Sequence, residues 1–334
     1  MPTESSPRRP PLDPAVAEVR LAVRRSLGSA LDPGDLVLVA LSGGPDSLAL
    51  AAATAFEAPK LGLRAGAVVI DHGLQGGSSQ VAASAAASAR SLGLDPVVVT
   101  RVEVRGSGGP EASARSARYA AFEAALADTG ASAVAIGHTL DDQAETVLLG
   151  LARGAGASSL QGMAPVTGRY LRPLLTVRRS TTHAACAAEG LDVWTDPHNT
   201  DPSFSRVRVR ANVLPVLERE LGPGIADALA RTAEQLREDA EAFDAMIDEF
   251  IEEICEPAEA GIAVSVAALA ANPAALRNRI IRIVAAGEFG QSLSRVHTLA
   301  IASLVTDWHG QGSVDVPGIS VSREGGRIVF TARG

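Results

Sequence analysis

The sequence predicts an α/β fold in which a doubly wound, mostly parallel sheet is followed by a second, smaller and mainly helical domain. Short apolar segments alternate with helical ones at a spacing of about 30 residues, which is typical of parallel strands covered on both faces. The chain has 334 residues, more than the roughly 250–300 that usually form one domain. The alternation ends after Gly154, and helical periodicity returns from Val207.

The elements of the first domain follow in order. Asp13-Pro14 is typical of a helix start, and that helix is expected to run to about Leu27. The strands that follow are expected at 35–41, 64–71, 96–104 and 131–137. Their helices are expected at 47–56, 78–92, 111–128 and 140–153. Right-handed crossovers place the carboxyl ends of all four strands, and any ligand site, along one edge.

The second half of the chain is less regular. A strand is expected near Tyr170–Leu175 and a short helix from Thr176. We place a boundary near Pro215, which gives a disordered tail (1–12), a first domain (13–215) and a C-terminal domain (216–334). In the last domain, helices are expected at 225–254, 273–286 (capped by Asn272) and 293–305, and strands at 313–316 and 327–331.

Composition excludes several classes of protein. Apolar residues make up 46% and charged residues 20%, which excludes a wholly disordered chain. Aromatic residues are only 3%, too few for a base-stacking platform. No apolar run approaches the roughly 20 residues that span a bilayer, and Cys186 and Cys255 are too few for a disulfide framework. We therefore expect a cytoplasmic protein without a membrane partner.

The charge is unevenly distributed. The formal net charge of −8 argues against a general nucleic-acid binder. Between Gly154 and Arg210, however, seven arginines face four acids, a balance of +3, whereas 216–256 has three arginines against thirteen acids, a balance of −10. An anionic partner could therefore dock on the first domain.

The segment after the first expected strand reads Ser42, Gly43, Gly44, Pro45, Asp46 and Ser47. Glycines let backbone amides approach a ligand, and the following helix start attracts anions. The segment lacks the Lys-Ser/Thr of a Walker A loop. Asp46 would repel a phosphate unless a cation such as Mg²⁺ lies between them. A glycine turn capped by serine is the structural alternative.

This segment resembles the PP-loop of N-type ATP pyrophosphatases, which attack the α-phosphate of ATP and release pyrophosphate. Three later segments resemble those of the tRNA(Ile)-lysidine synthetases: Glu111–Tyr119 (EASARSARY), Gly137–Thr146 (GHTLDDQAET) and Asp196–Pro215. The resemblance covers about 35–215 in order. Gln75 and Val207 depart from the usual pattern, where arginine and asparagine are expected.

The resemblance implies a fold like that of the PP-loop ATPases (adenine nucleotide α-hydrolases) and roles for individual residues. ATP would be bound by Ser42–Ser47 together with Asp71 and His72. The residues implied in catalysis are Asp46, Arg115, His138, Asp141 and Arg206. Those implied in binding lysine are Asp141, Asp142 and Glu145; those implied in binding tRNA are Arg118, Arg208 and Arg210. Mg²⁺ would be held by Asp46 and Asp141.

The residues alone leave alternatives open. Their offsets place His138, Asp141 or Asp142, and Glu145 on one helix face, but acids in a first helical turn also serve as caps. Each arginine taken singly could form a surface ion pair. His72 could contact the nucleotide or close its strand. A His-Asp-Asp-Glu set also suits other metals, although ATP chemistry favours Mg²⁺.

The implied reaction is a C–N ligation. ATP would adenylate the wobble cytidine of tRNA(Ile) with a CAU anticodon, and free L-lysine would displace AMP to give lysidine. Another PP-loop ATP pyrophosphatase, such as a tRNA thiolase or an amidotransferase synthetase domain, is the first alternative, and a non-catalytic nucleotide-binding regulator is the second. A homodimer is an open alternative for the assembly.

Overall fold

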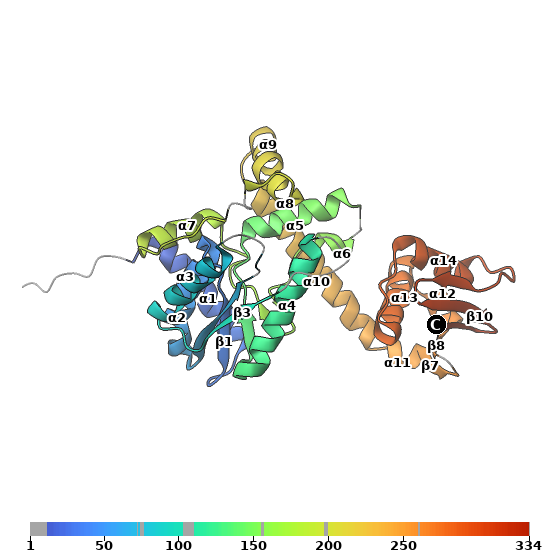
Figure 1. Cartoon of the computed structure of the whole chain (residues 1–334). Helices are drawn as coiled ribbons and strands as arrows, with labels where there is room; N and C mark the ends of the chain where they lie inside the picture. Colours follow the sequence, from blue (N-terminus) through green and yellow to red (C-terminus); the bar gives the residue numbers. More distant parts are fainter. Residues whose placement is uncertain are drawn as a thin grey trace, which may run out of the picture. The chain divides into compact units, whose positions relative to one another are not determined.

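The computed structural model describes residues 12–71, 73, 77–102, 110–154, 157–196, 200–259 and 261–333 (Figure 1). Of the expected tail, only Leu12 is therefore described. The chain forms two compact units that divide between Arg237 and Glu238, and each unit has its own hydrophobic core. Within the described ranges, no helix is long and apolar enough to cross a bilayer.

The first unit contains a six-stranded sheet in the order β3-β2-β1-β4-β6-β5. Its strands are β1 (Leu36–Ala40), β2 (Arg64–Asp71), β3 (Val97–Arg101), β4 (Ala133–Ala135), β5 (Val166–Thr167) and β6 (Tyr170–Leu171). Neighbouring strands are parallel, except that β5 runs antiparallel to β6. The predicted mostly parallel sheet is confirmed.

Helices cover both faces of this sheet. The helices of the first unit before α10 are α1 (Pro14–Ala30), α2 (Pro45–Glu57), α3 (Ser78–Ser91), α4 (Pro110–Thr129), α5 (Leu140–Ala152), α6 (Ala157–Leu160), α7 (Arg179–Ala188), α8 (Ser205–Arg208) and α9 (Leu214–Glu220). Successive residues of a strand point to opposite faces. Val37 and Val39 therefore pack with α1, α2, α3 and α7, whereas Leu36 and Leu38 pack with Phe122 of α4 (Figure 1).

The division between the units falls inside one helix, α10 (Ile225–Asp248), later in the chain than the boundary placed near Pro215. Pro215 lies instead in the first turn of α9, directly after a π-helical turn at Val209–Val213. Leu214 and Ala226 pack with Leu140 of α5. The segment after Pro215 therefore contributes to the core of the first unit.

The second unit combines helices with a five-stranded antiparallel sheet, in the order β7-β8-β11-β10-β9. Its strands are β7 (Cys255–Ala258), β8 (Gly261–Ser265), β9 (Val314–Val316), β10 (Ile319–Glu324) and β11 (Arg327–Ala332). Its helices after α10 are α11 (Ile251–Ile254), α12 (Val266–Ala271), α13 (Ala274–Phe289) and α14 (Arg295–Thr306). Sequence patterns predict β9 and β11, but not β7, β8 and β10.

Two helix starts differ from the prediction. Asn272 does not cap α13: it ends α12, where its Nδ2 donates to the Ala268 carbonyl at 2.9 Å, and Pro273 takes the cap position of α13. The helix expected from Thr176 begins three residues later, because Arg178 occupies its N-cap.

Candidate active site

The PP-loop, residues Ser42–Ser47, connects β1 to α2 and is held in shape by its own hydroxyl groups. Ser47 Oγ donates to the Gly44 carbonyl oxygen at 2.9 Å and accepts the Ser42 N–H at 3.2 Å. Gly43 has φ +85°, and its carbonyl oxygen accepts the Trp194 N–H at 3.0 Å. Ser47 is thus used within the loop, whereas Ser42 remains exposed.

The N-terminus of α2 lies at the carboxyl edge of the sheet, directly after this loop. Gly44 is its N-cap and offers no side-chain acceptor to the N–H groups of the first turn. Such uncapped N–H groups, together with the helix dipole, attract anions. The loop therefore has the properties predicted for a pyrophosphate-binding segment.

Gly137, after β4, lies against the start of α2. A Cβ added to Gly137 would lie 3.1 Å from the carbonyl carbon and oxygen of Asp46 and 3.2 Å from the Ser47 nitrogen. Because β1 and β4 are adjacent parallel strands, their following segments meet at the same edge. A side chain here would press on the backbone of Asp46 and Ser47, so glycine suits this close contact, which brings the Gly137–Thr146 motif to the PP-loop.

The helix of that motif, α5, begins with a capping box. The Asp142 carboxylate accepts the Thr139 N–H at 2.8 Å and the Thr139 hydroxyl at 2.9 Å. Asp142 therefore has the role of a helix cap, which the sequence left open as the structural alternative. His138 precedes the cap and lies outside the helix, so it does not share a helix face with Glu145 as the spacing predicts.

Three carboxylates of α5 and the PP-loop carboxylate form what we call the acidic cluster: Asp46, Asp141, Asp142 and Glu145. Glu145 is fully buried. It accepts two hydrogen bonds from Arg210, at 2.7 and 3.1 Å, and lies 3.8 Å from the Nε of Arg206. Two of the arginines predicted to bind RNA or phosphate are thus bound to the cluster itself.

Arg179, at the first position of α7, joins the whole cluster and is absent from the predicted site. Its guanidinium lies 2.7 Å from Asp142, 3.2 Å from Glu145 and 3.4 Å from Asp46. Its backbone N–H donates to Asp141 at 2.7 Å. The adjacent arginines Arg178-Arg179 give a signal in the sequence, because cations are unfavourable at a helix N-terminus and need acidic partners there.

The pKa values follow from burial and these ion pairs. Burial raises the pKa of Asp46, and the hydrogen bond from Thr182 and the charge of Arg179 only partly offset it. Burial would also raise the pKa of Asp142, but Arg179 and the Thr139 hydrogen bonds reverse the effect and lower it. Of these two carboxylates, Asp46 would therefore gain more from a further cation.

His138 is half-buried and lies near several cations. Its Nδ1 has no hydrogen-bond partner among the described residues. Burial lowers the pKa of His138 to about 4, against the charge of Asp142, and the charges of Arg172, Arg118 and Arg206 lower it further. The imidazole is therefore neutral at pH 7 and cannot act there as a charged acid.

The remaining predicted arginines are not bound to the acidic cluster. Arg115 donates to the Tyr119 hydroxyl at 3.4 Å. The guanidinium groups of Arg115 and Arg118 both lie over the Tyr119 ring. Both are exposed on α4. Arg208 donates to the carbonyl oxygens of Pro202 and Ser203, at 2.7 and 2.8 Å, and so stabilises its own turn.

A cleft of about 350 Å³ lies at the carboxyl ends of β2 and β3. Asp71 and Arg101 line it, together with alanines of α3, and the Ala85 Cβ of that helix lies 3.8 Å from where a Gly43 Cβ would be. Asp71 is buried and accepts the Gly73 N–H at 3.1 Å. His72 and Gln75 lie outside the described residues.

Gln143, in the same motif, has a structural role. Its Nε2 donates to the Met163 carbonyl at 2.8 Å, and its Oε1 accepts the Met163 N–H at 2.6 Å. A Cβ on Gly162 would lie 2.5 Å from the same Oε1. Gln143 therefore fixes the segment after α6 to α5.

The expected ligands of Mg²⁺ are Asp46 and Asp141. In the part of the chain that the structure describes, no three His, Cys, Asp or Glu side chains are grouped so as to hold a metal by themselves. Mg²⁺ usually combines one or two carboxylates with substrate phosphates and water. Asp46 lies directly at the expected phosphate site, so these residues fit a Mg²⁺ ion that arrives with ATP.

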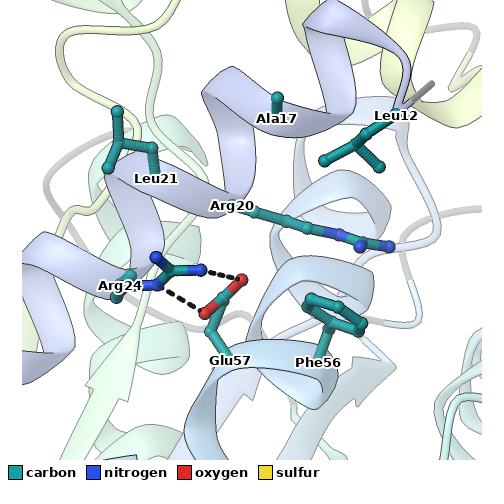
Figure 2. A pocket seen from close by; sticks show the side chains of 7 residues that line it. All are labelled: Leu12, Ala17, Arg20, Leu21, Arg24, Phe56 and Glu57. Carbon is teal, nitrogen blue, oxygen red and sulfur yellow. Dashed lines mark hydrogen bonds and ion pairs between the residues drawn. The ribbon is translucent and has the colours of Figure 1, made fainter. Parts of the chain in front are cut away.

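A second cavity, of about 460 Å³, lies between α1 and the C-terminal end of α2 (Figure 2). It is lined by Leu12, Ala17, Arg20, Leu21, Arg24, Phe56 and Glu57. Glu57 is fully buried, and Arg24 donates to both its oxygens, at 2.7 and 3.0 Å. Along α2, Glu57 lies roughly 16 Å from Asp46 at 1.5 Å per residue, so this cavity is separate from the acidic cluster.

Glu57→Gln is expected to lower the free energy of unfolding at pH 7 by about 1.5–3 kcal/mol, because Arg24 and Lys60 lose a charged partner. Burial opposes ionisation of Glu57, but these cations lower its pKa below the ordinary 4.5. The stabilisation from these ion pairs is complete above pH 4.5, the ordinary pKa, and is lost as the pH falls through the lowered pKa of Glu57. Urea unfolding at pH 7 and pH 4 measures this; an equal effect at both would contradict it.

Both cysteines are unsuited to sulfur chemistry at this site. Cys186 is buried, its Sγ donates to the Pro45 carbonyl at 3.2 Å, and burial raises its pKa to about 11. Cys255 belongs to β7 of the other unit, and burial raises its pKa as well.

Comparison with known proteins identifies the family. Residues 20–217 match the family model described as the PP-loop domain, and residues 265–329 match that of the TilS substrate binding domain. The tRNA(Ile)-lysidine synthase of Leifsonia xyli subsp. xyli is 62% identical over 301 residues, which cover 90% of this chain and 91% of that protein. The chain belongs to the tRNA(Ile)-lysidine synthase family. The resemblance found in the sequence is confirmed.

Other members of the tRNA(Ile)-lysidine synthase family match over a similar length at lower identity. The protein of that name from Thermobifida fusca is 55% identical over 96% of this chain and 98% of its own length. The one from Mycobacterium bovis is 47% identical over 90% of this chain and 91% of its own length.

A solved structure shares the fold. The U34-tRNA thiolase NcsA from Methanococcus maripaludis, determined with its 4Fe-4S cluster, matches with a TM-score of 0.56 and 20% identity, over 67% of this chain and 80% of that one. At this identity the likeness concerns the fold alone, and it agrees with the PP-loop architecture of the first unit.

Proposed function

We propose that this enzyme uses ATP to join free L-lysine to the wobble cytidine of tRNA(Ile) with a CAU anticodon, forming a C–N bond and releasing AMP and pyrophosphate. One observation carries the proposal. Arg179 lies 3.4 Å from Asp46 of the PP-loop and 2.7 Å from Asp142 of α5, so a phosphate-binding loop and a set of carboxylates suited to an amine form a single site.

The first half of the reaction takes place at the PP-loop. The uncapped N–H groups of α2 hold the departing pyrophosphate, and the cleft beside Asp71 holds the nucleoside. Asp46 and Asp141 would hold the Mg²⁺ that arrives with ATP, and this ion would neutralise phosphate charge. Arg115, His138 and Arg206 serve the transfer of the adenylyl group, the arginines by stabilising charge on the α-phosphate.

The second half takes place at the carboxylates of α5. An amine with a pKa of about 10.4 is almost wholly protonated at pH 7, so the site must bind a cation and then accept its proton. Asp141, Asp142 and Glu145 are the proposed partners of lysine. Asp141 has the most exposed side chain of the three, 21% against 10% and 0%, and is the one an ammonium reaches first.

The tRNA contacts are proposed for Arg118, Arg208 and Arg210 and for the second unit, part of which matches a substrate-binding family. Arg279 of that unit is committed to Asp244, and Arg277 donates to the Asn272 carbonyl at 3.1 Å, so these two arginines serve their own fold. We place the enzyme in the cytoplasm, where ATP, lysine and tRNA meet; light scattering will determine whether it is a homodimer.

The test measures AMP and pyrophosphate release from labelled ATP, with tRNA(Ile) bearing a CAU anticodon and with or without lysine. Complete turnover that requires both substrates, with lysidine in the product RNA, supports the proposal. AMP formed with another acceptor would favour a different PP-loop ligase. ADP, or no product under any condition, would overturn the assignment.

Asp141→Asn is expected to raise the KM for lysine at least about tenfold, the loss of one charged hydrogen bond, and to raise the KM for ATP by a smaller factor, because Asp46 remains as the other proposed metal ligand. The neutral amide keeps the shape that accepts the Arg179 N–H but no longer attracts an ammonium. Steady-state kinetics with each substrate varied in turn measures both constants. Equal effects on the two would remove Asp141 from the amine site.

A further inference from the structure

The guanidinium of Arg179 occupies the interior of the acidic cluster. It lies 2.7 Å from an oxygen of Asp142 and 3.2 Å from an oxygen of Glu145, the two most buried carboxylates of the cluster. A substrate ammonium bound by these carboxylates needs the same oxygens. Arg179 and the amine of lysine therefore compete for one place.

The charges of the cluster are nearly balanced. Among the described residues, its four carboxylates are paired with four arginines, which are Arg178, Arg179, Arg206 and Arg210. Arg178 also pairs with Asp227, at 3.3 Å, so the formal sum of these side chains is −1, and most of the carboxylate charge is already neutralised when an ammonium arrives. Displacement of one arginine leaves a more negative site, and Arg179 is the one that contacts three of the four side chains.

ATP offers Arg179 another partner. The Nε of Arg179 lies 3.4 Å from Asp46, the longest of its three carboxylate contacts, at the start of the helix whose N–H groups face the expected phosphates. Guanidinium groups bind phosphate oxygens with two parallel hydrogen bonds. Phosphates in the PP-loop would therefore draw Arg179 away from α5.

We propose that Arg179 is a positioning residue that fills the amine site until ATP binds, so that lysine binds after ATP. This inference rests on the proposed function. In that reaction the amine is needed only once the cytidine is adenylated, and Arg179 delays its entry to that stage. ATP and lysine then bind cooperatively, because each favours the position of Arg179 that suits the other.

The experiment measures lysine binding by calorimetry with the full chain and the tRNA(Ile) transcript. Each titration is done with and without the Mg²⁺ complex of α,β-methylene-ATP, an analogue that cannot transfer its adenylyl group to the RNA. In the unaltered enzyme the analogue should tighten lysine binding at least about fivefold, a modest coupling for two linked sites. Arg179→Gln should bind lysine without the analogue as tightly as the unaltered enzyme does with it. In this variant the analogue should therefore change the affinity for lysine less than about twofold.

Two further variants complete the test. Arg178→Gln makes the same charge change in the neighbouring residue, whose contacts are with Asp141 and Asp227 at 3.8 and 3.3 Å, and should keep the analogue's effect. Arg179→Lys keeps a cation in the cluster, so it should fold even where the glutamine variant does not, and should bind lysine more weakly than Arg179→Gln.

The outcomes separate the two proposals. An enzyme that binds lysine equally with and without the analogue, or an Arg179→Gln variant that loses lysine affinity or keeps the fivefold effect, overturns the role of Arg179 alone. An unaltered enzyme that binds the analogue but never lysine overturns the proposed function and, with it, this inference.

Discussion

Asp46→Ala is expected to reduce the release of AMP and pyrophosphate at least about a hundredfold, as for other groups that stabilise transition-state charge. Asp46 is the PP-loop residue in the first turn of α2 that lies 3.4 Å from Arg179, and it is a proposed ligand of the metal that accompanies ATP. Without this carboxylate, the metal that would neutralise the phosphates loses a proposed ligand, and Arg179 loses one of its three carboxylate partners. Conversion of labelled ATP to AMP measures the loss.

The same change should leave the stability of the fold nearly intact. Burial raises the pKa of Asp46, so its charged form is less favourable in the folded protein than in water, and a neutral side chain loses little. Asp46→Asn, which can still accept the hydrogen bond from Thr182, is the matched control for shape and should be as inactive as the alanine variant. A large drop in the thermal unfolding temperature of both variants would make Asp46 a structural residue.

Glu145→Ala is expected to lower the free energy of unfolding of the first unit by about 3 kcal/mol and to abolish activity. Removing one partner of a buried ion pair typically costs about 3–5 kcal/mol, because the other charge stays buried. Here the arginines paired with Glu145 keep 18–33% of their side chains exposed, so water recovers part of the loss. Urea unfolding followed by Trp194 fluorescence, in a Trp308→Phe background, reports on this unit.

The control for this change is an exposed ion pair. Glu220 lies 2.8 Å from Arg219, with 61% of its side chain exposed, and Glu220→Ala should change the free energy of unfolding by less than about 0.5 kcal/mol. If Glu145→Ala costs no more than the control, the buried carboxylate does not hold the arginines in place.

Local patterns were sufficient for the first unit and insufficient for the second. The segment 64–71 coincides with β2, because each apolar strand there is followed by a helix that the pattern also predicts. In the second unit, β8 pairs with β11, and Ile262 lies opposite Phe330, far away in the sequence. Distance does not account for β7 and β10, which form hairpins with their chain neighbours β8 and β11; both hairpins were missed in the sequence interpretation.

The acidic residues of the site could be found in the sequence, but their partners could not. A motif places Asp142 and Glu145 one helical turn apart, yet nothing in it indicates that Arg179, more than thirty residues later, fills the space between them. The boundary near Pro215 stays a prediction. The match to the PP-loop domain ends at residue 217, whereas Leu214 and Ala226, on either side of Pro215, pack into the same core.

Because the pKa values of both thiols are raised, the natural cysteines should react slowly with labelling reagents, which suits the protein to spectroscopic labelling at introduced cysteines. Maleimide and methanethiosulfonate reagents attack thiolates, and neither Cys186 nor Cys255 readily becomes one near neutral pH. Cysteines introduced by Ser91→Cys and Ser313→Cys, at exposed positions in different units, should react first. Pulsed electron paramagnetic resonance could then follow the separation of the units as tRNA binds, with both natural cysteines retained.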